Sequence, residues 1–174
     1  MNPLITKRQI IDHLAKSIQD KSRQYMIENF LTTQDLSKGG IMVPFRLFPR
    51  QIDLITAYST YTNNVTTKPR QAGISTVTSA FIACEIAVTD KAKPMNILII
   101  TNKIDMSKNF LKKIKDFLLQ FPRYFWGNDY FGTKEKEDKT IFRIDNQAEI
   151  ELATNDCHIY ARSSGPDASR GISG

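Results

Sequence analysis

The sequence has few of the residues that build metal centres or disulfide frameworks. It contains two cysteines, Cys84 and Cys157, and two histidines, His13 and His158. Neither pair has metal-ligand spacing, and the widely separated cysteines indicate buried thiols in a reducing compartment rather than a disulfide. No apolar run approaches the roughly 20 residues of a membrane span, and the polar segment 1–20 lacks the apolar core of a signal peptide. These absences favour a globular protein that crosses no membrane, with incidental histidines.

The bulk composition is that of one globular domain. Of the 174 residues, 41% are hydrophobic and 24% are charged, which suits a soluble domain of ordinary size with a core. The formal net charge is +6. A positive charge of this size permits a polyanionic partner but does not require one.

The stretch Thr66–Thr76 has the layout of a phosphate-binding loop that lacks the usual lysine. It joins a β-prone run at 64–67 to a helical run at 77–88. Backbone N–H groups at such a helix start point at an anion, and the helix dipole favours it. Gly73 and Ser75 match the second glycine and the hydroxyl of the pattern G-x-x-x-x-G-K-[ST].

The cation of this loop has to come from another position. Ile74 stands where the pattern has lysine, and Lys68 stands where it has the first glycine. Lys68 and Arg70 lie just upstream, and either side chain could fold back over the loop to replace the lysine. The alternative is an ordinary β-to-α turn that contains a glycine and surface charges.

Gln51 is a candidate for base recognition. Pro49 suits the first turn of a helix that runs to about Tyr58, which places Gln51 in that turn, upstream of the loop. A glutamine amide offers a donor and an acceptor together, which matches the N6 and N7 edge of adenine. The alternative is a glutamine exposed to water at a helix start.

The remaining periodicity predicts an α/β fold. We expect helices at 6–18, 23–31, 49–58, 77–88 and 104–121, and strands at 64–67, 96–101, 140–144, 148–152 and 156–161. The right-handed crossover rule then predicts a parallel sheet, with the loop at the carboxyl ends of its strands and the helix 77–88 buried against it. Residues 32–40 are the best linker candidate, so we divide the chain into a helical lead-in, 1–44, and a partial P-loop domain, 45–174. The lysines of 104–121 indicate a solvated helix face or one that contacts DNA.

Four stretches add a resemblance through their order and spacing. They are Phe45–Gln51, Lys68–Thr76, Ile97–Ser107 and Ser163–Gly171. They resemble, in turn, the adenine motif, the deviant Walker A loop, the second strand with its helix, and the loop before Walker B of the large terminase subunit. That protein is the DNA-packaging motor of tailed bacteriophages. In this family the cation often stands at the front of the loop.

The resemblance implies a P-loop NTPase-like fold of the RecA-like (ASCE) type, with a parallel sheet flanked by helices and with ATP and Mg²⁺ as cofactors. It implies that Ser75, or Thr76 in its place, ligates Mg²⁺, and that Lys68 or Arg70 neutralises the phosphates. By the same resemblance, adenine is read by Gln51, and the phosphates are cradled by Gln71, Ala72, Gly73, Ile74, Ser75 and Thr76.

Arg170 lies in the loop that resembles the one before Walker B. The resemblance makes it a candidate arginine finger that acts on a neighbouring subunit of a homo-oligomeric ring. The alternative is a loop arginine exposed to solvent.

The implied activity is ATP hydrolysis coupled to translocation of double-stranded DNA into the procapsid. The implied partners are double-stranded DNA, gripped through its phosphates, together with the portal protein and the small terminase subunit. The implied location is the host cell cytoplasm, at the portal vertex of the procapsid.

The Walker B acids and the nuclease domain of that family would follow the loop that carries Arg170. The sequence ends at Gly174, so we expect an N-terminal piece of a longer protein, incomplete in its ATPase site and unable to hydrolyse ATP usefully by itself. Two other functions stay open: a helicase-like P-loop ATPase, and a non-catalytic scaffold that binds nucleotide or DNA.

Overall fold

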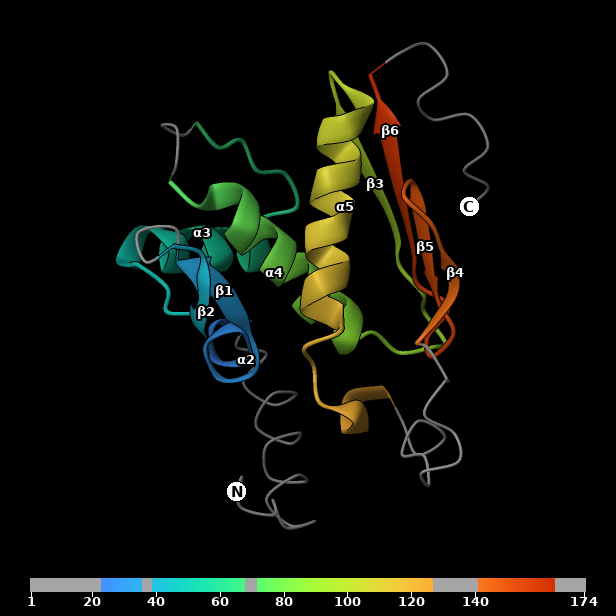
Figure 1. The fold of residues 1–174 in the computed structure, drawn as a ribbon, viewed down its shortest axis with the longest axis horizontal. Helices are drawn as coiled ribbons and strands as arrows, with labels where there is room; N and C mark the ends of the chain where they lie inside the picture. Colours follow the sequence, from blue (N-terminus) through green and yellow to red (C-terminus); the bar gives the residue numbers. More distant parts are fainter. Residues whose placement is uncertain (1–22, 36–38, 68–71, 127–140, 165–174) are drawn as a thin grey trace.

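The computed structural model describes residues 23–35, 39–67, 72–126 and 141–164 (Figure 1). Its elements are α2 (Arg23–Phe30), β1 (Thr32–Asp35), β2 (Ile41–Pro44), α3 (Pro49–Thr60), α4 (Ile74–Ala87), β3 (Asn96–Thr101), α5 (Ile104–Leu118), a 3-10 helix (Arg123–Trp126), β4 (Phe142–Asp145), β5 (Glu149–Leu152) and β6 (His158–Ser163). The helix expected at 6–18 lies outside the described residues.

The fold is α/β, with a mixed four-stranded sheet flanked by helices. The strand order is β3-β6-β5-β4. Strands β3 and β6 are parallel, whereas β5 pairs antiparallel with both β6 and β4. The strands predicted at 96–101, 140–144 and 148–152 are therefore confirmed as β3, β4 and β5, but the prediction of a parallel sheet holds for one strand pair of those described. The short β4–β5 connection requires antiparallel pairing, and the Oδ1 atom of Asn146 accepts a hydrogen bond from the Ala148 N–H at 2.9 Å within it.

The strand predicted at 64–67 is wrong. Residues 61–67 form no strand and are exposed, and the side chain of Val65 is 98% exposed. The run has β-branched residues, but a strand also needs a paired neighbour and a face to bury. The candidate phosphate loop consequently does not follow a strand of the sheet. Figure 1 shows the start of α4 beside α3, on the side of the molecule away from the four-stranded sheet.

The helix α4 is buried among helices, where we expected it to pack on a sheet. It lies against α5 on one side and against α2 and α3 on others. Its side chains are apolar around most of the circumference, which allows burial on several sides. The fully buried residues of α4 include Val77, Ala80, Ala83, Cys84 and Ile86. An ion pair between Arg23 and Glu85 joins α2 to α4.

The amino-terminal elements pack into the same core as the rest of the described chain. Met26 and Ile27 of α2 are fully buried. The segment that we expected to be a linker contributes β1, which pairs antiparallel with β2. Gly39 and Gly40 between these strands have φ angles of 72° and 81°, which side chains rarely adopt, and so permit the reversal.

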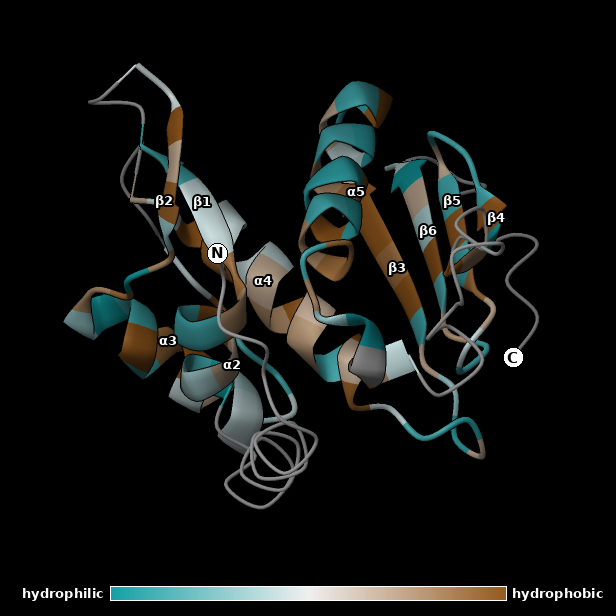
Figure 2. Cartoon of the chain, turned by 60° about the horizontal axis from the view of Figure 1, so that its bottom comes forward, coloured by the Kyte–Doolittle hydropathy of each residue, from teal (hydrophilic) through white to brown (hydrophobic). Residues whose placement is uncertain are grey.

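The amphipathic helix predicted at 104–121 is confirmed as α5. Its buried stripe includes Leu111, Ile114 and Leu118, and the helix lies across one face of the sheet. Figure 2 shows the hydrophilic outer side of α5 and the hydrophobic strand β3 behind it. Among the described helices, none combines the length and apolar character needed to cross a membrane.

Candidate functional site

The candidate site is the backbone turn that opens α4. Gly73 occupies the position before the helix with a φ of 71°, a left-handed conformation that glycine adopts without strain. Its carbonyl accepts hydrogen bonds from the N–H groups of Thr76 and Val77, each at 3.0 Å. Within the part of the chain that the structure describes, no acceptor is found for the N–H groups of Ile74 and Ser75. Within the described residues, two donors at the positive end of the helix thus lack an acceptor, as a site for an anion requires.

The side chain of Gln51 is buried beside this turn. It is 6% exposed, and its amide bridges two segments of the chain. The Oε1 atom accepts a hydrogen bond from the Phe48 N–H at 3.1 Å, and the Nε2 atom donates to the Ala72 carbonyl at 3.3 Å. The structure thus brings Gln51 and Gly73 together, as an ATP site of the predicted kind requires, but it shows the amide engaged with backbone groups.

The first turn of α4 also lines a groove that sequence reasoning missed. Thr76 shares this groove, of about 740 Å³, with the β1–β2 hairpin and α5. Lys112 and Lys113 of α5 line it too. Lys112 is paired with Asp116 at 2.7 Å, whereas no ion pair involves Lys113 in the described chain. The lysine-rich face of α5 was visible in the sequence, but its position beside α4 depends on how the two helices pack.

Several predicted site residues are outside the part of the chain that is described. These residues are Lys68, Arg70, Gln71 and Arg170. The roles of Lys68 or Arg70 as the cation and of Arg170 as the arginine finger therefore stay predictions.

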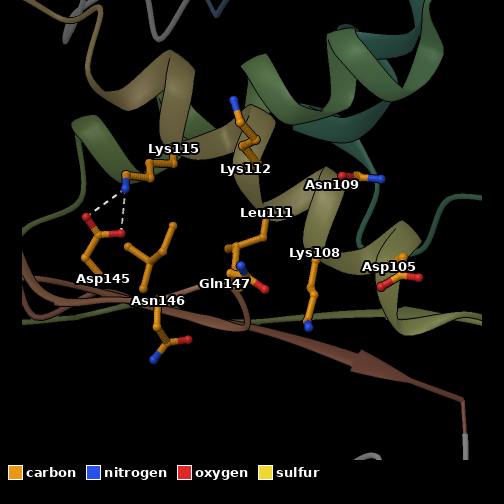
Figure 3. Close-up of a pocket in the computed structure, with 10 residues that line it drawn as sticks. Asp105, Lys108, Asn109, Leu111, Lys112, Lys115, Asp145, Asn146 and Gln147 are labelled. Carbon is orange, nitrogen blue, oxygen red and sulfur yellow. Dashed lines mark hydrogen bonds and ion pairs between the residues drawn. The ribbon is translucent and has the colours of Figure 1, made fainter.

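A second groove lies away from the Gly73 turn, between α5 and the β4–β5 connection (Figure 3). Its volume is about 720 Å³, and none of the predicted site residues lines it. An ion pair between Lys115 and Asp145, at 2.6 Å, joins its two walls. Lys108 and Gln147 also line it. Most of the residues that line it are charged or polar types, unlike the hydrophobic and aromatic residues that predominate in pockets for small ligands.

One histidine has more defined surroundings than the sequence suggested. The Nε2 atom of His158 lies 2.7 Å from Glu149 Oε1, and its Nδ1 atom lies 2.8 Å from the hydroxyl of Tyr160. The two rings stack with centroids 4.2 Å apart. Since Glu149 lies on β5 and His158 on the adjacent antiparallel strand β6, their hydrogen bond joins these two strands, whereas the contact with Tyr160 lies within β6. Alternation along a strand placed His158 and Tyr160 on one face, and this was the available signal.

The described chain offers few side chains that could coordinate a metal ion together. No group of three or more histidine, cysteine or acidic side chains in it is arranged to hold an ion. Both cysteines are buried and free, and burial raises the pKa of each thiol, that of Cys84 most strongly. The role of the Ser75 hydroxyl, in the first turn of α4, as a ligand of Mg²⁺ stays a prediction.

Comparison of the chain with protein-family models and with curated proteins finds no match.

Proposed function

We propose that this chain binds ATP as part of a terminase-type DNA-packaging ATPase, with the phosphates at the amino-terminal end of α4. The observation that supports the proposal is the turn at Gly73, where the N–H groups of Ile74 and Ser75 lack acceptors in the described structure. Helix starts of this kind favour phosphate because the free N–H groups and the helix dipole act together. The Ser75 hydroxyl stands in the first turn, where it can reach a phosphate-bound Mg²⁺.

The finer assignments extend the same resemblance. We propose a P-loop, RecA-like identity for the fold, Lys68 or Arg70 as the phosphate-neutralising cation, and Arg170 as the arginine finger. The proposed partners are double-stranded DNA, the portal protein and the small terminase subunit, with action in the host cytoplasm at the portal vertex. The net charge of +6 is compatible with a polyanionic partner.

A thermal-shift titration of the whole chain with Mg-ATP tests the proposal. At a concentration 100 times the dissociation constant, ligand binding stabilises a protein by about 2.7 kcal/mol, which is a measurable rise in melting temperature. We expect Lys68→Ala combined with Arg70→Ala to abolish the rise, and Ser75→Ala to reduce it. Ser59→Ala is the matched control, because Ser59 is an exposed serine on α3 that bonds to its own helix.

The opposite result would favour the scaffold function. If Mg-ATP leaves the melting temperature unchanged and the double substitution has no effect, the turn at Gly73 is a structural bend. A rise that the double substitution leaves intact would place ATP at another site.

A further inference from the structure

We propose that Gln51 is a positioning residue, which holds the backbone of Ala72 and Gly73 in the shape that receives phosphate. The inference rests on the proposed function, because it concerns the same turn. In this role Gln51 supports the turn, and thereby the binding of any ligand with a phosphate chain. In adenine recognition it would contact the base instead.

The amide of Gln51 is committed on both sides. Its oxygen accepts from the Phe48 N–H at 3.1 Å, and its nitrogen donates to the Ala72 carbonyl at 3.3 Å. The side chain is 6% exposed, so little of the amide is available to a base. Burying an amide without hydrogen bonds costs free energy. Here the Oε1 atom and the Nε2 atom of Gln51 each have a backbone partner.

The helix that carries Gln51 is itself fixed against α4. Ile55 of α3 is buried in the core. Further along α3, the Tyr58 hydroxyl lies 3.1 Å from Thr78 Oγ1, and the Tyr58 ring packs on Phe81 with centroids 5.3 Å apart. Gln51 therefore reaches the turn from a helix that is anchored to α4 further along. A site held by a docked helix is more precise than one held by a loop alone.

Gly73 contributes to the same contact between α3 and the turn. A Cβ atom on residue 73 would lie 2.9 Å from the Nε2 atom of Gln51, so the amide packs closely on the α-carbon. The carbonyl of the same residue anchors the N–H groups of Thr76 and Val77. Contact with Gln51 thus restrains the residue that sets the direction of the first turn of α4.

The test measures binding of three ligands to the whole chain: Mg-ATP, Mg-GTP and magnesium tripolyphosphate. Gln51→Met keeps the side-chain volume and removes both hydrogen bonds. We expect it to weaken all three ligands by the same factor, about tenfold for the hydrogen bonds that it removes. Asp53→Asn is the matched control, because Asp53 is exposed on the same helix, and we expect it to change none of the affinities. A loss confined to Mg-ATP overturns the inference and restores adenine recognition.

Hydrogen exchange without ligand decides the inference independently of binding. We expect Gln51→Met to speed exchange of the Thr76 and Val77 N–H groups, which bond to Gly73, while exchange in β6 stays unchanged. Unchanged exchange at the turn would overturn the inference, and Gln51→Ala repeats the measurement if the methionine variant does not fold. A wild-type chain that binds none of the three ligands would end the proposed function, yet the exchange result would still show whether Gln51 positions the turn.

Discussion

Gln51 and Gly73 approach so closely that a side chain on residue 73 would have to displace the Gln51 amide: the Nε2 atom of Gln51 lies 2.9 Å from the ideal Cβ position of residue 73. Gly73 also has a φ of 71°, which most residues with a Cβ adopt only with strain. Two independent features therefore favour glycine here: the φ of the backbone and the closeness of the Gln51 amide.

Gly73→Ala separates these two reasons when it is compared with Gly39→Ala. Gly39 has nearly the same φ, 72°, but no atom lies within 4 Å of its ideal Cβ. We expect Gly39→Ala to lower the free energy of unfolding by about 1 kcal/mol, from backbone strain alone, and Gly73→Ala by about 2–3 kcal/mol. Urea unfolding measures both. Equal losses would mean that Gln51 moves aside without cost.

The ion pair between Arg23 and Glu85 gives a second prediction, about the packing of α2 on α4. The side chain of Arg23 is 10% exposed and that of Glu85 28%, so Glu85→Gln leaves a largely buried cation without its partner. We expect a loss of about 1–2 kcal/mol in the free energy of unfolding, reduced from a fully buried pair by the exposure of Glu85.

Asp116→Asn is the control for this pair. It breaks the ion pair with Lys112, in which the side chain of Asp116 is 50% exposed and that of Lys112 is 70% exposed. We expect it to lower the free energy of unfolding by about 0.3–0.5 kcal/mol. Urea unfolding of both variants gives the comparison, and a Glu85→Gln loss no larger than the control would show that α2 does not depend on this contact.

The sequence predicted the elements whose pattern is local. β3 begins and ends where the apolar run does, and α5 follows its hydrophobic stripe. The failures arise where the deciding interaction is distant. Residues 64–67 are rich in β-branched side chains but pair with no strand in the described chain, whereas the polar segment Thr32–Asp35 becomes a strand because β2 pairs with it.

In the candidate site, too, the local features were predicted and those that depend on distant contacts were not. The apolar run at 77–88 predicted α4, although the helix begins three residues earlier, at Ile74. That its amino-terminal end binds an anion stays a prediction. The burial of Gln51 was not predicted, although one signal was present: a glutamine three residues after a helix cap often bonds back to the cap N–H, as Gln51 does to Phe48. The contact with Ala72 depends on how α3 packs against α4, which no local pattern contains.

The buried thiols give a third prediction. Desolvation raises the pKa of Cys84, and burial raises that of Cys157 as well. A raised pKa in the fold favours the neutral thiol, so this contribution to stability is complete below the unfolded value of about 8.5 and is lost as the pH rises toward the folded value. We expect neither thiol to react with a disulfide reagent at pH 8 in the native chain, and both to react in urea. Rapid labelling of the native chain at either position would contradict the burial.

Asp156 gives the last prediction, because it combines a charge contact with an unusual backbone. Its φ is 56°, and its carboxylate accepts a hydrogen bond from Arg143 at 2.8 Å, which lowers the pKa of Asp156 below its ordinary value. A lowered pKa means that the contribution to stability is present above the unfolded value, about 3.9, and is lost as the pH falls through the lower folded value.

Two substitutions separate the charge of Asp156 from its backbone. Asn tolerates a positive φ, so Asp156→Asn should remove this acid-dependent contribution with little added strain, whereas Asp156→Ala should be less stable than Asp156→Asn at every pH. Thermal unfolding between pH 2 and pH 7 measures both effects. Because protonation of the wild-type carboxyl already abolishes the charge contact, the wild-type and Asn curves should converge at the acid end, and a constant gap between them would assign the effect to the backbone alone.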